Sequence, residues 1–275
     1  MIKTQIVHGN NQAIVDDWGR ILTFQANTER DVAQGRVDGR MPFHRFGFNA
    51  TVASGTVDDI WSYGPTDRTY NWLTTADELR LAAGNVNDDA GGSGALTVNL
   101  IYLDEYWNTR SETLLTNGTS ASLTTSKKAI RFIRASVEQT GTILGNNTGN
   151  IIIETEGGTA VGFIAAGIGQ TEMTMYTVPA GFNAYLVHVD INVSVGTNRE
   201  SDIQFWQRPN ADVVSAPFSA KKLVGRWIGV DRDIQRDYHA QPCFTPKTDI
   251  WLDGSASASS AAISVDYDLD LVRIT

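Results

Sequence analysis

The stretch AAISVDYDLDLVRIT, residues 261–275, alternates apolar and polar side chains with a period of two. Successive side chains of a β-strand point to opposite faces of the sheet, so this alternation predicts a half-buried strand. The apolar face carries Ile263, Val265, Tyr267, Leu269 and Leu271, and the polar face carries Ser264, Asp266, Asp268 and Asp270. Aspartates two residues apart on a strand are separated by roughly 7 Å, too far for three of them to chelate one ion. The aspartate row therefore indicates the solvent face of a sheet rather than a metal site.

The same period recurs along most of the chain. AYLVHVDINVSV (184–195) predicts one inward face made of Tyr185, Val187, Val189, Ile191, Val193 and Val195, and LTVNLIYL (96–103) predicts another strand. Turn sequences rich in Gly, Asn and Asp separate these runs, among them TNGTS, GNNTGN and EGGTA. Residues 74–81 fit a short helix or a strand about equally well. Together the runs predict an all-β fold of antiparallel β-sandwich or jelly-roll bodies with an extended N-terminal arm.

Three regions follow from where the alternation is weak or strong. Residues 1–48 are polar with little alternation and predict the arm. Residues 49–165 predict a first β-sandwich region. Residues 166–275 alternate most strongly and predict a second, jelly-roll-like β-sandwich region.

Composition narrows the functional class. The 275 residues carry a formal net charge of −9, which argues against a nucleic-acid binder. The first twenty residues lack the apolar run of a signal peptide, and no stretch approaches the roughly 18 apolar residues of a membrane span. We therefore expect no membrane partner and assembly in a cytoplasm. The single cysteine, Cys243, excludes an intramolecular disulfide and is expected to be a buried or inert thiol.

No motif points to catalysis or to a cofactor. The loop NVNDDAGGSGA (85–95) has the oxygen-rich composition of a cation site but lacks the spacing of an EF-hand, so a turn with Asx hydrogen bonds is the favoured interpretation. The sequence contains no phosphate-binding glycine loop and no GxSxG motif. Its four histidines share no motif. We expect a non-enzymatic protein without metal or cofactor.

The segment TERDVAQGRVDGRMPFHRFGFNATV (28–52) concentrates basic residues in an acidic protein. Arginine binds carboxylates in two places at once, and aromatic side chains anchor interfaces. The segment therefore predicts a partner-binding arm. Its candidate contact residues are Arg30, Arg36, Arg40, Phe43, Arg45 and Phe46.

Three stretches resemble virion structural proteins of tailed bacteriophages. They are FHRFGFNATVASGTVDDIWSYGPTDRTYNW (43–72), NDDAGGSGALTVNLIYLDEYWNTRSETLLTNGTS (87–120) and QTEMTMYTVPAGFNAYLVHV (170–189). Ile101-Tyr102-Leu103-Asp104 stands where the group tends to show Gly-Leu-Asp, which changes a local turn. Some members of this group decorate or cement capsids, so the resemblance implies a β-rich structural role in a virion.

The resulting functional expectation is a capsid cement or decoration protein. It would fasten neighbouring major capsid subunits and form a homo-oligomer, a trimer or a dimer. A tail or fibre-adaptor protein is one alternative. A surface carbohydrate-binding virion module is another, because seven tryptophans offer stacking platforms, with Trp107 in a loop.

Overall fold

The computed structural model describes residues 5–8, 11–15, 21–22, 28–64, 69–142, 145–194, 200–258 and 260–274. The chain divides into two compact units, Met1–Met41 and Pro42–Thr275. In the first unit β1 (Gln5–His8), β2 (Asn11–Val15) and β3 (Ile21–Leu22) form an antiparallel sheet, and α1 (Thr28–Ala33) follows. The division falls before residue 48, the expected end of the arm, because β4 (Arg40–Val52) pairs with a strand of the second unit.

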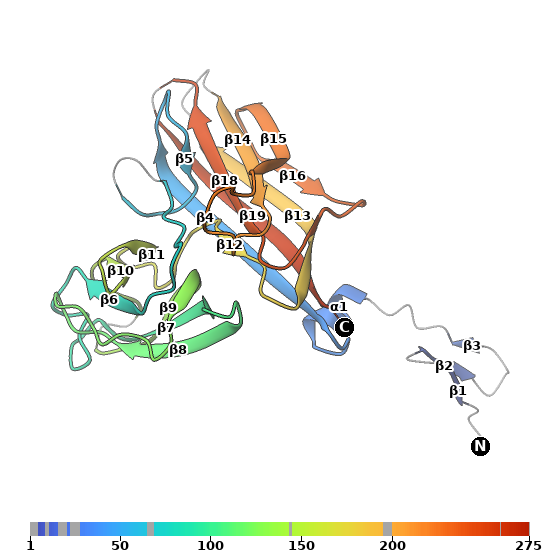
Figure 1. Ribbon diagram of the computed structural model, residues 1–275, viewed down its shortest axis with the longest axis horizontal. Helices are drawn as coiled ribbons and strands as arrows, with labels where there is room; N and C mark the ends of the chain where they lie inside the picture. Colours follow the sequence, from blue (N-terminus) through green and yellow to red (C-terminus); the bar gives the residue numbers. More distant parts are fainter. Residues whose placement is uncertain are drawn as a thin grey trace. The chain divides into compact units, whose positions relative to one another are not determined.

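The second unit contains four antiparallel sheets (Figure 1). Their orders are β11-β10-β6, β8-β7-β9, β12-β18-β14-β15 with β5 beside β18, and β16-β13-β19-β4 with β17 beside β13. The expected all-β, antiparallel class is thus confirmed. The strands are β5 (Asp58–Asp59), β6 (Leu79–Ala83), β7 (Ala95–Asp104), β8 (Thr109–Leu115), β9 (Ala129–Thr140), β10 (Ile151–Thr155), β11 (Ala160–Ile164), β12 (Tyr176–Thr177), β13 (Phe182–Ser194), β14 (Ser201–Arg208), β15 (Lys222–Val230), β16 (Ile234–Asp237), β17 (Cys243–Phe244), β18 (Asp249–Ala256) and β19 (Ala261–Arg273).

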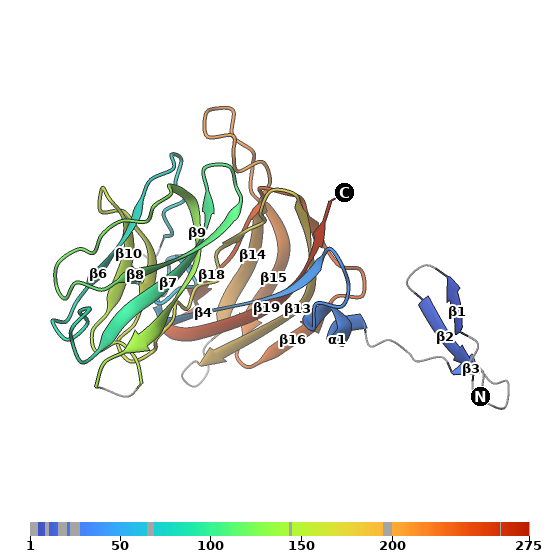
Figure 2. The ribbon, with the colours of Figure 1, turned by 90° about the horizontal axis from the view of Figure 1, so that it is seen from below.

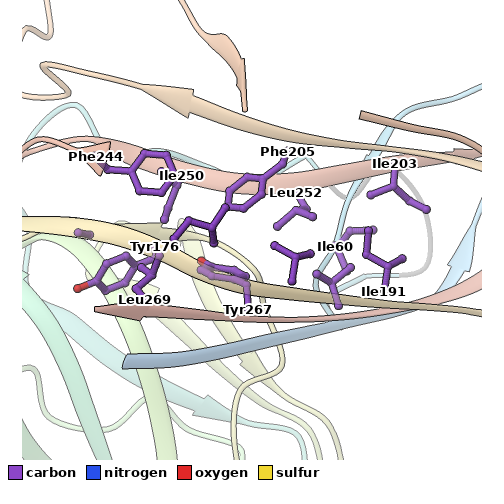
Figure 3. Close-up of a cluster of buried hydrophobic side chains, with 14 of the residues drawn as sticks. Ile60, Tyr176, Ile191, Ile203, Phe205, Phe244, Ile250, Leu252, Tyr267 and Leu269 are labelled. Atoms are coloured by element: carbon purple, nitrogen blue, oxygen red, sulfur yellow. The ribbon is translucent and has the colours of Figure 1, made fainter. Parts of the chain in front are cut away.

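One apolar core lies between the two five-stranded sheets (Figure 3). Phe205 of β14 and Tyr267 of β19 meet in it with ring centroids 5.5 Å apart. The core takes every second residue of the long strands, as the period of two requires. Its labelled members are Ile60, Tyr176, Ile191, Ile203, Phe205, Phe244, Ile250, Leu252, Tyr267 and Leu269.

A second core joins the β11-β10-β6 sheet to the β8-β7-β9 sheet. It is built from β6, β7, β9, β10 and β11, with Met173, Met175 and Trp251 added from later in the chain. Residues 74–81, which fitted helix and strand equally, end in strand β6.

Residues from both sides of residue 165, the expected boundary between the two β-sandwich regions, share one core. Leu103, Trp107 and Ile133, from the first region, pack in the core that the two five-stranded sheets enclose. β4 and β5 likewise belong to sheets made mainly of later strands. Early strands thus pair with late strands in the same sheets. Local alternation does not predict this long-range pairing.

β13 and β19 form the longest strand pair of the described residues, and they lie side by side in both ribbon views (Figures 1 and 2). The predicted apolar face of β19 is buried from Ile263 to Leu271, which confirms its register. On β13, Val189, Ile191 and Val193 are buried as expected, but Tyr185 and Val187 are not. A β-bulge between Leu186 and His188 shifts the alternation by one residue, so Ala184 and Leu186 face the core instead. Val195 lies outside the described residues.

Candidate partner-binding surfaces

The six residues predicted for the arm lie on two units. Arg30 is on α1 and Arg40 begins β4. The exposed Arg36 guanidinium lies 3.4 Å from the carboxylate of Asp31. These three arginines precede the division at residue 41, whereas Phe43, Arg45 and Phe46 belong to the sheet of the second unit.

Phe43 and Arg45 are part of the folded body. The Phe43 ring stacks on Tyr176 with centroids 4.2 Å apart. Arg45 is only 3% exposed, and its Nη2 donates to the Met175 carbonyl at 2.5 Å. Burial lowers the pKa of Arg45 to about 10, because the charged guanidinium is removed from water. Phe46 is half-buried, with its ring centroid 6.0 Å from that of His44.

The strand at residues 40–52 is not predicted by the alternation of apolar and polar residues, because its inward residues are not apolar. Arg45, Gly47 and Asn49 occupy the buried positions. A Cβ on Gly47 would lie 2.6 Å from the Thr174 amide nitrogen, so the close approach of the two backbones requires glycine. The period of two is present, but hydropathy does not reveal it.

The outer face of the β16-β13-β19-β4 sheet carries a row of alternating histidines and aspartates. His44 Nδ1 lies 2.8 Å from Asp268 Oδ1, and His188 Nδ1 lies 2.7 Å from Asp237 Oδ1. His188 and Asp268 are cross-strand partners. Asp266 and Asp268 are about half-exposed, as the solvent-face prediction requires. Among the described residues, no group of three His, Cys, Asp or Glu side chains is arranged to hold a metal ion.

Asp270 does not lie on the solvent face that was predicted for the aspartate row, since only 8% of it is exposed. It is opposite Tyr185, next to the bulge in β13. Cys243, on the neighbouring β17, was expected to be a buried or inert thiol, and it is an exposed free thiol, so the buried alternative is wrong.

A buried ionic network joins strand β9 of one three-stranded sheet to strands β12, β14 and β18 of one five-stranded sheet. Arg131 of β9 donates two hydrogen bonds to the carboxylate of Asp249 on β18, at 2.9 and 3.1 Å. Arg208 Nη2 and the Thr177 hydroxyl donate to the same carboxylate, at 2.5 and 2.7 Å. The Arg131 guanidinium also lies 5.1 Å from the centre of the Trp107 ring.

Two further carboxylates are buried opposite each other on β5 and β18. Asp59 and Asp253 are cross-strand partners. Burial raises the pKa of Asp59 to about 7 despite a 2.7 Å hydrogen bond from the Tyr70 amide, and Asp253 adds to the increase. Burial also raises the pKa of Asp253 to about 6, although Lys221 and the Trp206 indole favour its charged form.

Two sheet edges carry exposed apolar side chains. β8 has β7 as its single neighbour within the sheet, and β15 likewise has β14. An open groove of about 730 Å³ runs beside β8, between residues 112–117 and 121–124. Leu115 and Leu123 line it and are 60% and 87% exposed. On β15, Ile228 is 69% exposed.

The oxygen-rich loop at 85–95 is a turn, as predicted. Asp88 is fully buried, and its carboxylate accepts hydrogen bonds from the amides of Ala95, Thr148 and Gly149 at 2.7–2.8 Å. Asp89 accepts from the Gly91 amide two residues later, which is an Asx turn. The aspartates therefore bind backbone amides of the loop itself and of the neighbouring segment at residues 148–149.

No tryptophan among the described residues is an exposed stacking platform of the kind considered above, and Trp72 and Trp206 are half-buried. Trp107, the residue singled out for that role, is buried, because a left-handed backbone (φ 66°) turns it inward onto Arg131. Trp61, Trp227 and Trp251 are also buried. Trp18 lies outside the described residues.

No protein-family model matches the chain, and no curated protein matches it. Among solved structures, a chain from "Structure of infectious bursal disease virus Gt strain" aligns with 9% identity over 90% of this chain and 83% of that one, with a TM-score of 0.21. The Gx strain structure gives 10% identity, 86% and 76% coverage, and a TM-score of 0.19. The crystal structure of the VP2 subviral particle of that virus gives 8% identity over 90% of this chain and 82% of that one, with a TM-score of 0.18. All three structures are from infectious bursal disease virus, and TM-scores this low do not indicate a shared fold. In the described residues, no helix has the length and apolar character needed to cross a membrane.

Proposed function

We propose that this protein is a non-enzymatic structural component of a bacteriophage virion, and most specifically a capsid cement or decoration protein. Its partner would be the major capsid protein, and its location the virion after assembly in the host cytoplasm. The proposal starts from the three stretches that resemble tailed-phage virion proteins, which together cover much of residues 43–189.

The observation that carries the proposal is the pair of sheet edges with exposed apolar side chains. A sheet edge presents unpaired backbone amides and carbonyls that pair readily with another chain. Soluble monomers protect such edges with charges, bulges or covering loops. Here β8 adjoins a groove with Leu115 and Leu123 exposed, and β15 exposes Ile228. Both edges suit strand addition by a neighbouring subunit, with the apolar side chains as anchors.

The packing of the second unit suits a mechanical role. A cement protein resists forces between subunits only if its own body does not deform. The two apolar cores and the Arg131–Asp249 network tie distant strands together. The two five-stranded sheets around one core fit the β-sandwich interpretation, and the jelly-roll connectivity remains part of this proposal.

Attachment by many copies would supply the strength. Each contact can be weak, because a homo-oligomer, dimer or trimer that binds several capsid subunits at once gains from effective concentration. The first unit, which carries Arg30 and Arg36, would extend such contacts by pairing with carboxylates of the partner.

The test is reconstitution on purified particles that lack the protein. We expect saturable binding of hundreds of copies per particle and a higher temperature of capsid disruption. Leu115→Asp with Leu123→Asp should reduce the bound copies. Val57→Asp, at another exposed apolar residue, serves as the matched control. Binding of only a handful of copies at one vertex would instead favour the tail or fibre-adaptor alternative, and no binding would refute the virion role.

A further inference from the structure

Two neighbouring arginines in the second unit lack a carboxylate partner. For Arg45 and Arg134, no ion pair with a carboxylate is found within the part of the chain that the structure describes. Arg134 Nη2 donates to the His44 carbonyl at 3.3 Å, and its guanidinium lies 5.4 Å from the centre of the Phe43 ring. Neither contact brings a negatively charged group to Arg134.

Arg45 is the more demanding of the two because it is buried. Its Nη2 is satisfied by the Met175 carbonyl, but its Nε is buried and has no hydrogen-bond partner among the described residues. A buried charge is costly unless it is paired, and a buried donor without an acceptor adds to that cost. The positive charge of Arg134 disfavours a second charge on Arg45.

A small cavity lies between β4, β9 and residues 170–171, and both Arg45 and Arg134 contribute to its lining. His44, Arg45, Arg134, Gln170 and Thr171 line it, and its volume is about 10 Å³. That volume holds about one water-sized atom. The Thr171 hydroxyl oxygen accepts a hydrogen bond from the Ala135 amide at 3.1 Å, so its proton is left to donate. The residues that line the cavity therefore include hydrogen-bond donors and two positively charged side chains.

We infer that this cavity is a binding site for an oxyanion, such as a carboxylate, phosphate or sulfate, that inserts one oxygen atom. A water molecule fits the space but cannot neutralise two guanidinium charges, whereas an oxyanion both accepts from the donors and offsets the charges. The volume excludes a fully enclosed phosphate. The remaining oxygens therefore stay outside the cavity, and among the lining residues His44 and Gln170 are exposed and Arg134 is half-buried.

Nearby acidic groups limit the affinity. Asp268 Oδ1 is 2.8 Å from His44 Nδ1, and Asp266 Oδ1 is 3.9 Å from His44 Nε2. Both carboxylates are partly exposed on the outer sheet face and repel an anion that approaches from that side. We therefore expect dissociation constants in the millimolar range for free anions, and tighter binding only for an anionic group held in place by a larger partner.

The test uses the full-length protein and three salts at equal ionic strength: sodium phosphate, sodium acetate and sodium chloride. Phosphate or acetate should raise the melting temperature above that in chloride, and the Arg45 Nε–H resonance should shift on titration. Arg134→Gln should weaken binding by about tenfold, the typical effect of losing one charged hydrogen bond. Arg232→Gln, at an exposed arginine paired with Asp231, is the matched control and should respond like the wild type.

The outcomes separate the sources of the anion. A response to acetate alone identifies a carboxylate site, a response to phosphate alone identifies a phosphate or sulfate site, and either supports the inference. Because Arg45→Gln removes a buried side chain and is at risk of unfolding the protein, the conclusion rests on Arg134→Gln and the Arg45 resonance. Equal melting temperatures in all three salts, or an unchanged response in Arg134→Gln, would overturn the inference. This test is independent of any role in a virion.

Discussion

Arg131 and Asp249 are 118 residues apart in the sequence and form a two-bonded ion pair in which 2% and 0% of the side chains are exposed. Arg131 comes from β9, in the group of strands β6–β11, and Asp249 begins β18, in one of the two five-stranded sheets. Arg208 and Thr177 complete the coordination of the carboxylate. The pair ties the two strand groups of the second unit to each other.

Removing the charge of Asp249 should therefore destabilise the whole second unit. Asp249→Asn leaves Arg131 and Arg208 near each other without a counter-charge, and breaking a buried pair typically costs about 3–5 kcal/mol. Urea unfolding at pH 7 should show a loss of this order. The surface pair Arg232–Asp231 offers the comparison, and Arg232→Gln should leave the unfolding midpoint unchanged. A midpoint for Asp249→Asn equal to that of the wild type would contradict the role of the network.

Stability should rise as the pH falls from 8 toward 5, because of Asp59 and Asp253. Their pKa values, about 7 and about 6, lie above the ordinary value of 3.8, so the folded protein binds more protons than the unfolded chain between these limits. The charged forms destabilise the fold, and this penalty appears as the pH rises through each folded-state pKa. For Asp59 the full effect is on the order of a few kcal/mol.

Asp59→Asn tests this pH dependence directly. The amide oxygen still accepts the hydrogen bond from Tyr70, while the titration is removed. We expect the variant to be more stable than the wild type at pH 8 and to show a flatter stability profile between pH 5 and 8. Asp231→Asn, on the surface, should keep the wild-type slope. An identical slope in the Asp59 variant would show that Asp59 is not the titrating group.

Asp88→Ala should unfold the loop at 85–95 and weaken the adjoining sheets. The buried amide of Ala95 and the part-buried amides of Thr148 and Gly149 lose their acceptor. Each unsatisfied buried donor costs about 1–3 kcal/mol, so we expect a loss of about 3 kcal/mol or more in thermal or urea unfolding. The neighbouring Asp89→Ala, which loses one Asx bond, should be mild. A calcium-dependent rise of the wild-type melting temperature that disappears in Asp88→Ala would revive the cation-site interpretation.

The bulge in β13 predicts opposite outcomes at two valines that the sequence places on one face. Val189 is buried, so Val189→Asp puts an unpaired charge in the core and should prevent folding. Val187 faces away from that core, and Val187→Asp should leave a folded protein. Circular dichroism and size-exclusion chromatography of the two variants would decide between them. Comparable loss of folding in both would place the bulge elsewhere.

Deletion of residues 1–38 should leave the second unit folded, since β4 begins at Arg40. If the first unit fastens the protein to its partner, the truncated protein should melt at nearly the wild-type temperature but be retained less on particles. Arg30→Ala with Arg36→Ala should reproduce part of this loss in a salt-sensitive way. Undiminished retention after truncation would remove the first unit from the interface.

Local alternation was enough to determine the class of the fold and much of its core. In β19 the apolar residues from Ile263 to Leu271 obey a period of two without interruption, and all of them are buried. The Gly- and Asp-rich loop was likewise recognisable as a turn, because Asx bonds form between residues close in sequence. Such features depend on neighbours along the chain, which a sequence displays directly.

The rest depended on contacts between residues far apart in sequence, and only the tertiary structure decided it. The bulge after Leu186 changes which residues of β13 are buried, and no residue type at that position predicts it. Most of β4 was assigned to the extended arm because Arg45, Gly47 and Asn49 fill its inward positions, and their burial follows from the approach of Thr174 and Met175. The cavity between Arg45 and Arg134 exists for the same reason. Contacts between residues roughly a hundred positions apart determine where a charged side chain such as Arg45 lies and what surrounds it. A local sequence pattern does not show which distant residues make those contacts.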